Sequence, residues 1–426
     1  MVHYFSFLIY AWLLFPLSFI TVQIWSLFNE KIRRGLGGRK ELFNQLKEFR
    51  STNSGKVILF HCVSYGEVLQ AKPIAQRIKE KHPDIKTVVS FISPSGYDNL
   101  KESAEFDFKT YLPIDKYSYA YRFFSILRPH LWIIVKHDIW PNHVKACSDL
   151  NIPIILIDAN LPHTSRRLKP IAASFYKSFY RDFKLVLPVS DDDAERFLKV
   201  FPYRDRIVTA GDTRYDQVYS SAQIAKDKEV QKLPFFQDKK VFIGGSVWKE
   251  DLQHILPALP RIMDKDKSLF LILVPHEIDN EQMSFLEMEL KQLNLPFCKY
   301  NEIEEIPTER ILIIDCIGLL AATYKYGYIA YVGGSFSTGV HNVMEPAIFR
   351  SPVLFGPRYT NSFEAIEMVK RGGGFSITNS DDFYKYASDL INDPQKRDKA
   401  GETAETVVLE NLGASERITV HIEKYL

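Results

Sequence analysis

The sequence predicts an α/β protein of two domains, each built on a parallel sheet flanked by helices. Short β-branched apolar runs alternate with longer amphipathic runs along most of the 426 residues, which is the pattern of strands and helices in parallel α/β folds. The chain is also longer than one hydrophobic core usually organises, so two domains of about 200 residues each are expected. The strand-like runs end at small or polar residues, as they do where strand ends form a ligand-binding edge.

The expected elements divide the chain into an N-terminal anchor at residues 1–30 and domains at residues 31–216 and 217–426. The segment 211–216 closes the first domain, and the polar run 220–238 resembles a crossing between domains. First-domain strands are expected at residues 57–61, 87–92, 131–135, 154–157 and 185–189. Second-domain strands are expected at residues 241–243, 269–274, 311–314, 329–332 and 353–354. The first of these should run into a turn at residues 244–246, and the glycines at 372–374 should form a flexible turn.

Residues 4–28 carry no charge and are rich in Phe, Leu, Ile and Trp. A helix formed by this segment would be long enough to cross a bilayer. Basic residues follow at Lys31, Arg33, Arg34, Arg39 and Lys40. A signal peptide has the opposite order, with its charges before the apolar segment. We therefore expect an uncleaved anchor that spans a membrane or lies in its interface, with the body of the protein on the cytoplasmic side. The alternative is a buried N-terminal helix.

The net charge of +2 conceals an uneven distribution. Residues 1–212 hold 30 Lys and Arg against 21 Asp and Glu, a net charge of +9, and the remainder has a net charge of −7. A basic first half favours an anionic surface or substrate, and the acidic second half argues against nucleic acid as a partner. The four cysteines form no C-x-x-C pair, so neither a zinc site nor a disulfide framework is expected. Cys62 is expected to be a small buried residue at a strand end.

The stretch 329–346, IAYVGGSFSTGVHNVMEP, has the order of a nucleotide site: a strand, a glycine turn and a polar cluster opening a helix. Glycines without Cβ atoms let backbone N–H groups approach a phosphate, and a helix start favours an anion. A carboxylate one turn further on could accept hydrogen bonds from both ribose hydroxyls. The residues concerned are Gly333, Gly334, Ser335, His341, Asn342 and Glu345. The alternative is a tight strand-to-helix turn with an Asn cap.

The first domain has a counterpart in Ser64, Gly66 and Glu67, placed between the first strand and a helix at about residues 68–81. A carboxylate in the first turn of a helix normally stays ionised, which is also what a general base requires. Structural N-capping is the alternative interpretation.

The loop Lys136-His137-Asp138, followed by Trp140, ends another first-domain strand and could line an acceptor pocket. Trp140 could equally be a core anchor whose N–H finds a carbonyl.

Arg214 lies near the expected domain junction, where a guanidinium could hold a phosphate or carboxylate in bidentate fashion. An ion pair with Asp212 or Asp216 is the competing account. His276 and Ser246 belong to the same expected ligand edge of the second domain. The acidic run 191–193 could suggest a metal, but Ser190 before it makes these residues first-turn acids of a helix, and no metal site is assigned.

Taken together, several motifs in one order resemble the 3-deoxy-D-manno-octulosonic acid (Kdo) transferases of lipopolysaccharide assembly. The motifs are Ser64-x-Gly66-Glu67, the Ser-Pro-Ser-Gly at 93–96, Leu112-Pro113-x-Asp115, Trp140-Pro141-Asn142, residues 211–216, and Val332-Gly333-Gly334-Ser335 with His341-Asn342-x-x-Glu345. The resemblance implies a GT-B architecture, with two Rossmann-like domains facing across a cleft. It places the acceptor on the N-terminal domain and CMP-Kdo on the C-terminal domain.

The resemblance also implies roles for single residues. Glu67 would be the base that deprotonates a hydroxyl of the lipid A precursor, and Arg214 occupies the position of a lysine thought to stabilise developing negative charge. Pro275, His276, Ile317, Gly318, Asn342 and Glu345 fall where the family contacts CMP. The motifs described above add Ser246, Gly333, Gly334, Ser335 and His341 as expected donor-binding residues, and Ser64, Gly66, Lys136 and Asp138 as expected acceptor-binding residues. Lys136-His137-Asp138 stands where many members have Glu-Thr-Glu, so the role of the first glutamate is not carried over.

The function implied is a single inverting transfer of Kdo from CMP-Kdo to the lipid, without metal or other cofactor, because CMP is already a leaving group. Two alternatives remain open at the level of sequence. One is another GT-B enzyme, a transferase or epimerase that uses a UDP-sugar. The other is a catalytically inactive, membrane-tethered protein that binds a sugar nucleotide.

Overall fold

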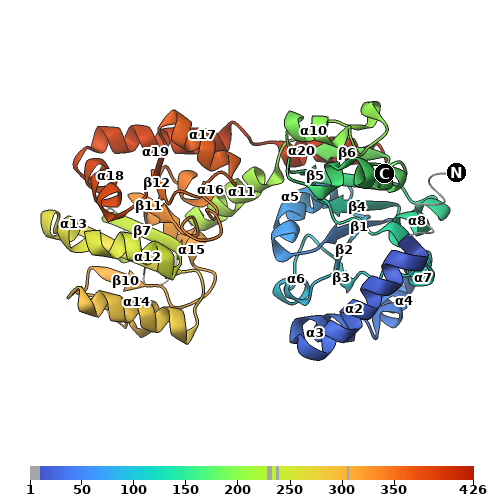
Figure 1. The fold of residues 1–426 in the computed structure, drawn as a ribbon, viewed down its shortest axis with the longest axis horizontal. Helices are drawn as coiled ribbons and strands as arrows, with labels where there is room; N and C mark the ends of the chain where they lie inside the picture. Colours follow the sequence, from blue (N-terminus) through green and yellow to red (C-terminus); the bar gives the residue numbers. More distant parts are fainter. Residues whose placement is uncertain (1–9, 228–232, 237–238, 305–306) are drawn as a thin grey trace. The chain divides into compact units, whose positions relative to one another are not determined.

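The computed structural model describes residues 10–426 apart from 228–232, 237–238 and 305–306. The chain divides into two compact units (Figure 1). Unit 1 comprises Met1–Gln217 together with Gly413–Leu426, and unit 2 comprises Val218–Leu412.

Unit 1 contains a six-stranded parallel sheet in the order β3-β2-β1-β4-β5-β6, which is the strand order of a dinucleotide-binding domain. The strands are β1 (Val57–Cys62), β2 (Lys86–Phe91), β3 (Phe108–Tyr111), β4 (Leu131–Val135), β5 (Ile154–Ala159) and β6 (Leu185–Pro188). The main flanking helices are α4 (Leu42–Thr52), α5 (Tyr65–Lys81), α7 (Tyr117–Leu127), α8 (Pro141–Asp149), α9 (Pro170–Tyr180) and α10 (Asp191–Phe197). Helices cover both faces of the sheet, so its central strands are apolar runs without alternation.

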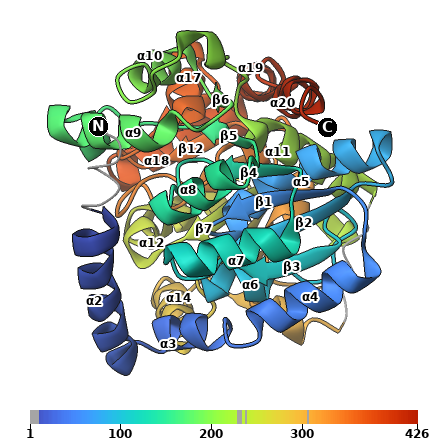
Figure 2. The same ribbon diagram turned by 90° about the vertical axis from the view of Figure 1, so that its right-hand side faces the viewer.

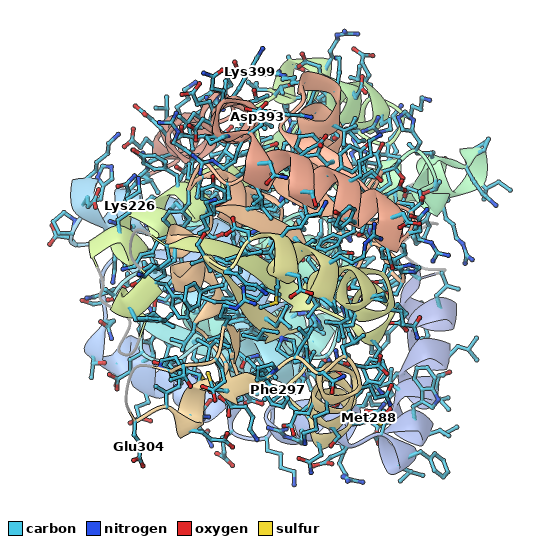
Figure 3. The ribbon with its side chains drawn as sticks, turned by 90° about the vertical axis from the view of Figure 1, so that its left-hand side faces the viewer. Lys226, Met288, Phe297, Glu304, Asp393 and Lys399 are labelled. Atoms are coloured by element: carbon cyan, nitrogen blue, oxygen red, sulfur yellow. The ribbon has the colours of Figure 1, made fainter. Side chains whose placement is uncertain are left out.

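Unit 2 contains a seven-stranded parallel sheet in the order β13-β12-β11-β7-β8-β10-β9. Its strands are β7 (Lys240–Val247), β8 (Leu269–Pro275), β9 (Phe297–Lys299), β10 (Ile311–Ile313), β11 (Ile329–Val332), β12 (Val353–Phe355) and β13 (Gly374–Ser376). The main helices are α12 (Lys249–Ile255), α13 (Leu259–Lys265), α14 (Asn280–Gln292), α16 (Met344–Ala347), α17 (Phe363–Arg371), α18 (Ser380–Asn392) and α19 (Pro394–Leu409). Asp393, labelled in Figure 3, begins α19 by accepting a hydrogen bond from the Lys396 N–H at 3.0 Å.

In each sheet the chain starts at the centre, builds outwards on one side and then returns to the other side of its first strand. This change of direction occurs between β1 and β4 in unit 1 and between β7 and β11 in unit 2. A crevice forms at the carboxyl ends of two such strands, because the loops that follow them leave in opposite directions. These two positions are where ligands bind in open α/β sheets.

All ten strands expected from the sequence are present, and three more are found. The additional strands β3, β9 and β13 have three or four residues each and form sheet edges. Phe297 of β9 is labelled in Figure 3. Short edge strands lack the long apolar run that marks a central strand, because only part of their surface is buried.

Two turns expected from glycine clusters have a different structure. Gly244 and Gly245 lie inside β7, which continues to Val247 through an irregularity in its pairing with β8. Gly372 ends α17 in the left-handed conformation (φ 89°), and Gly374 begins β13. These glycines are therefore parts of regular elements, because close packing or backbone conformation requires them there.

The N-terminal segment forms the π-helix η1 (Tyr10–Leu14) and the helices α2 (Phe15–Phe28) and α3 (Glu30–Gly37). Asn29 separates the two α-helices, and its side chain caps α3 by accepting a hydrogen bond from the Ile32 N–H at 3.1 Å. Among the residues that the structure describes, no helix has both the length and the apolar character needed to cross a membrane. Residues 1–9 of the expected anchor lie outside the described residues.

The helix α11 (Thr213–Asp227) carries the chain out of unit 1, so residues 220–227 of the expected polar run 220–238 are helical. Parts of the expected crossing, residues 228–232 and 237–238, lie outside the described residues.

The C-terminal helix α20 (Ala414–Glu423) packs on α5 in unit 1 and is visible at the edge of that unit in Figure 2. Asp216 fixes its start by accepting hydrogen bonds from the N–H groups of Gly413 and Ser415 at 2.7 and 2.6 Å. No pattern in the sequence signals this return of the chain.

Candidate active site

Glu67 lies at the point in unit 1 where the sheet changes direction. The chain leaves β1 at Cys62, turns at Val63 and Ser64, and places Glu67 in the first turn of α5. One carboxylate oxygen, Oε2, accepts a hydrogen bond from the Val63 N–H at 2.5 Å, and the residue is 7% exposed. Burial raises the pKa of Glu67 above its usual range, against the opposing effects of the Val63 N–H and Lys136. The hydrogen bond to the backbone that structural capping predicts for Glu67 is therefore present, but it involves only one of the two carboxylate oxygens.

Asp138 is held by two hydrogen bonds beside this turn. Its Oδ2 lies 3.0 Å from Nε2 of His61 and accepts a hydrogen bond from the Trp140 indole N–H at 2.6 Å. Burial alone would raise the pKa of Asp138, but His61 and Trp140 outweigh it, so the pKa lies below its usual value. The other ring nitrogen of the fully buried His61 lies 3.1 Å from the Ser90 hydroxyl. The indole of Trp140 thus binds a carboxylate, whereas the sequence suggested a carbonyl.

Lys136 follows β4 and Asp158 lies at the end of the adjacent strand β5, and both have left-handed backbone conformations, with φ of 68° and 48°. Such conformations cost about 1 kcal/mol or more for residues with a Cβ, and they cluster at functional sites. Lys136 lies close enough to Glu67 and Asp158 for its charge to lower the pKa of both carboxyls. Burial and the nearby Asp212 nevertheless keep the pKa of Asp158 raised.

Arg214 forms an ion pair with Asp212, which was one of the alternatives to ligand binding. Its Nε and Nη2 lie 2.8 and 2.7 Å from Oδ2 of Asp212. The preceding residue, Thr213, donates its N–H and hydroxyl to Asp158 at 2.9 and 2.5 Å. The start of α11 is therefore tied to the carboxyl edge of the unit 1 sheet. The guanidinium remains partly exposed, with 42% of the side chain accessible.

In unit 2, two glycines shape the turn after β11. A Cβ on Gly333 would lie 2.1 Å from the Ser246 carbonyl oxygen, and one on Gly334, whose φ is 94°, would lie 2.5 Å from the Gly339 oxygen. Only glycine fits these close approaches. Their N–H groups donate within the protein, to the Gly245 carbonyl at 3.0 Å and to Asp251 at 2.8 Å.

Ser335 is likewise engaged within the protein, because its buried hydroxyl accepts a hydrogen bond from the Gly356 N–H at 2.5 Å. The Gly-Gly-Ser motif thus holds the turn in shape. A direct phosphate contact from these three residues would have to displace internal hydrogen bonds.

Three aromatic rings are stacked at this edge of unit 2. The centroids of Trp248 and His276 are 4.4 Å apart, and those of His276 and His341 are 4.4 Å apart with the planes inclined by 6°. The Trp248 indole donates to Nε2 of His341 at 2.8 Å, so the proton of a neutral His341 is on Nδ1. Burial, with a contribution from His276, lowers the pKa of His341 to about 4, and burial also lowers that of His276. Both rings are neutral at pH 7.

Asn342 and Glu345 lie at the start of the short helix α16. The Asn342 side chain accepts a hydrogen bond from the Met344 N–H at 3.1 Å and donates to Glu345 Oε1 at 3.1 Å. Burial raises the pKa of Glu345 to about 7. The helix begins at Met344 with Val343 at its N-cap position and no side-chain cap, so His341 and Asn342 precede the helix and the expected Asn cap is not formed.

Ile317 and Gly318 form an open loop after β10. Ile317 is 92% exposed, and Gly318 has a φ of 93° with no atom within 4 Å of an added Cβ. Pro275 is the last residue of β8, the strand that pairs with β10.

Comparison with known proteins gives the same assignment over both units. Residues 37–217 match the family described as 3-deoxy-D-manno-octulosonic-acid transferase (kdotransferase). The chain is 26% identical to the 3-deoxy-D-manno-octulosonic acid transferase of Haemophilus influenzae over 375 residues, 87% of each protein. It is also 26% identical to the transferase of the same name from Aquifex aeolicus, over 82% of this chain and 91% of that one.

The N-terminal unit of the chain thus matches the Kdo transferase family, and most of the chain is similar to Kdo transferases. The chain is a glycosyltransferase. The solved structure of UDP-GlcNAc 2-epimerase from Neisseria meningitidis is similar to this chain with a TM-score of 0.63, 15% identity, and coverage of 87% of this chain and all of the other. That similarity concerns the fold, two Rossmann-like sheets of a GT-B-like fold.

Two residues of the candidate site in unit 2 were not identified from the sequence. Trp248 completes the stack of rings, and Asp251 accepts hydrogen bonds from the N–H groups of Trp248 and Gly334 and from the Tyr331 hydroxyl at 2.9, 2.8 and 2.8 Å. Asp251 stands three residues after Trp248, the position from which a side chain reaches back to cap the start of a helix. That spacing was the available signal.

Two minor predictions are confirmed. Cys62 is buried at the end of β1. The acids 191–193 form the first turn of α10, where the Ser190 hydroxyl accepts a hydrogen bond from the Asp193 N–H at 3.1 Å.

Proposed function

We propose that this chain transfers Kdo from CMP-Kdo to a lipid A precursor during synthesis of the lipopolysaccharide inner core. The observation that carries the proposal is the Glu67 carboxylate, which stands buried at the change of direction in the unit 1 sheet, within the residues that match the Kdo transferase family. A buried carboxylate with a raised pKa is a suitable general base near neutral pH.

Glu67 takes the proton from an acceptor hydroxyl as the oxygen attacks the anomeric carbon of Kdo. The new C–O bond forms as the bond from that carbon to the CMP phosphate breaks, and CMP leaves with the electron pair. Attack opposite the leaving group inverts the configuration, and the transition state has oxocarbenium character. The reaction needs no metal, because a phosphate ester already leaves readily when fixed donors receive its charge. Arg214 supplies one such cation, in place of the lysine of related enzymes.

Lys136 and Asp138 support the base and the acceptor. The Lys136 cation favours the ionised form of Glu67. Asp138, fixed by His61 and Trp140, offers its remaining oxygen to an acceptor hydroxyl. Ser64 and Gly66 shape the turn that presents Glu67.

CMP-Kdo binds to unit 2. The Nδ1–H of His341 is a neutral donor at the ring stack, and Glu345 is placed to receive the ribose hydroxyls. The exposed turn of Ile317 and Gly318 contacts the base of the nucleotide, while Ser246, Pro275, His276 and Asn342 complete the site. Gly333, Gly334 and Ser335 hold the turn that positions His341, whose N–H donates to the Gly333 carbonyl at 3.1 Å.

The enzyme works at the cytoplasmic face of the inner membrane. Support comes from α2, which exposes large apolar side chains, including Leu17, Leu27 and Phe28 at 64, 70 and 83%, and from the basic α3 that follows it. This combination suits a helix anchored at an anionic lipid surface.

The test is to incubate the detergent-solubilised protein with CMP-Kdo and tetraacylated lipid A precursor, with and without EDTA, and to follow the mass of the lipid. A gain of one or more Kdo units that survives EDTA supports the proposal. Transfer from a UDP-sugar in place of CMP-Kdo would replace it with the other GT-B reaction. Nucleotide binding without transfer from any donor would favour the inactive binding protein.

A further inference from the structure

Unit 1 contains an apolar cavity of about 360 Å³ that none of the roles above explains. The cavity lies between the N-terminal helices α2 and α3, the turn after β2 and the segment after β3. Phe19 and Val22 of α2, Leu36 of α3 and Ile114 supply apolar walls, and Trp140 closes one side. Its volume is in the range of pockets that hold small ligands.

Two of the charged side chains in the wall, Arg39 and Asp115, already have hydrogen-bond partners. Arg39 donates to the carbonyls of Leu112 and Ile92 at 2.8 and 3.0 Å, so its guanidinium secures the backbone. Asp115 accepts from the Tyr10 hydroxyl at 2.6 Å and from the His143 backbone N–H at 3.1 Å. With these groups engaged, the cavity offers a ligand apolar contact and few hydrogen bonds, which suits a hydrocarbon chain.

The helix that forms one wall is apolar on its opposite side as well. Ile20 and Leu27 of α2 are 56 and 70% exposed, whereas Phe19 and Val22 face the cavity. In Figure 2, α2 runs along the edge of unit 1. A helix with apolar side chains on two sides can contact an apolar phase on each of them, so the cavity opens beside a helix that suits a lipid surface.

One cation lies at the cavity. Lys31 lines it, and within the described part of the chain its ammonium group has no hydrogen bond or ion pair. An ammonium group next to an apolar cavity matches an amphiphile with an anionic head group.

Trp140 connects the cavity with the acceptor side of the candidate active site. One part of the indole lines the cavity, and its N–H donates to Asp138, which in turn lies 3.0 Å from His61. A ligand that fills the cavity therefore lies one side chain away from the residues assigned to the acceptor.

We propose that this cavity holds one acyl chain of the lipid acceptor, with Lys31 facing an anionic group of its head. The inference rests on the proposed function, because it identifies which part of the acceptor unit 1 recognises. Bulk phospholipid and detergent are the competing occupants, and the experiment separates them.

The cavity is filled by Val22→Trp, and Val420→Trp on the exposed side of α20 is the matched control, since Val420 is 47% exposed. Transfer is measured with tetraacylated lipid A precursor and with its O-deacylated form. We expect Val22→Trp to raise the KM for the tetraacylated acceptor about tenfold, the effect of losing a few buried methylenes, with kcat and the KM for the deacylated acceptor unchanged. The control should match the wild type. Equal changes in KM for both acceptors would overturn the proposal.

A second measurement does not depend on catalysis. A dodecanoyl probe carrying a diazirine is photocrosslinked to the protein without CMP-Kdo, and the labelled residues are mapped by mass spectrometry. Labelling of cavity residues in the wild type and in Val420→Trp, but not in Val22→Trp, supports the proposal, as does displacement of the probe by the acceptor. Displacement by phosphatidylglycerol vesicles alone would overturn it. Labelling of the cavity in a protein that transfers no Kdo would reject the proposed function while leaving an alkyl-binding cavity.

Discussion

The turn after β1 in unit 1 and the turn after β11 in unit 2 occupy equivalent places in their sheets, yet their chemistry differs. The first contains three ionisable groups close together: a buried Glu67, the cation of Lys136 and a second buried acid, Asp158. Lys136 and Asp158 also have left-handed backbone conformations. In the second, both histidines are uncharged, and the carboxyl groups of Asp251 and Glu345 accept hydrogen bonds. Strained backbone and ionisable groups with shifted pKa values cluster at reactive sites. From this comparison we propose proton transfer in unit 1 and donor binding in unit 2.

The largest effect is expected from Glu67→Gln, which removes the base with little change in shape. The kcat should fall about a thousandfold, within the range for loss of a general base, while the dissociation constant of CMP stays within about twofold of the wild type. Glu80→Gln, on the exposed side of α5, is the matched control. The measurements are transfer rates by lipid mass and CMP titration by calorimetry. An unchanged kcat would remove Glu67 from the mechanism.

Glu345→Gln tests the buried acid of unit 2 through stability. Burial raises its pKa in the folded state to about 7, above the value of about 4.3 in an unfolded chain. Between these values the folded state holds the extra proton, so the wild type loses stability as pH rises from about 4.3 through 7. The variant should therefore be more stable than the wild type at pH 8, by up to about 4 kcal/mol, because each pH unit of this interval contributes about 1.4 kcal/mol, and equal to it at pH 4. Urea unfolding at the two pH values measures this, and a pH-independent difference would contradict it.

Trp248→Phe keeps an aromatic ring in the stack but removes the N–H that donates to His341. A net hydrogen bond of about 1 kcal/mol corresponds to about a fivefold weaker affinity for CMP. The rate at saturating CMP-Kdo should not change. Trp12→Phe, on an exposed residue of the N-terminal segment, is the control. An affinity equal to that of the wild type would show that the tautomer of His341 is irrelevant to binding.

Lys136→Met tests whether the charge of Lys136 sets the pKa of Glu67. Without the cation, the pKa of Glu67 rises further, so the acid limb of the profile of kcat/KM against pH moves to higher pH. The loss relative to the wild type should be about fivefold larger at pH 6 than at pH 8. Lys136→Arg should restore the wild-type profile. A uniform loss at every pH would mean that Lys136 acts on the acceptor and not on the base.

The central strands and both ligand edges could be predicted from the sequence, because buried parallel strands are continuous apolar runs that end at small or polar residues. The edge strands β3, β9 and β13 could not, since they bury too little surface to leave such a run. The predicted turn at Gly244 and Gly245 was wrong, because the sequence does not reveal the close packing that requires glycine inside this strand. The Tyr324 side chain would meet a Cβ on Gly245 at 1.9 Å.

The motif residues Glu67, Asp138, His341 and Glu345 were also identifiable from sequence, but their partners were not. The donation from Trp248 to His341 spans 93 positions and that from Gly334 to Asp251 spans 83. Contacts of this range depend on the packing of the sheet, which no local pattern encodes. The same holds for α20, which returns to unit 1 through Asp216.

The proposed division of labour places chemistry in unit 1 and donor binding in unit 2. The most direct test measures the CMP dissociation constant and the single-turnover transfer rate at saturating CMP-Kdo in the wild type, Glu67→Gln and Trp248→Phe. We expect Glu67→Gln to lose only rate and Trp248→Phe to lose only affinity. Loss of both quantities by similar factors in either variant would contradict this division.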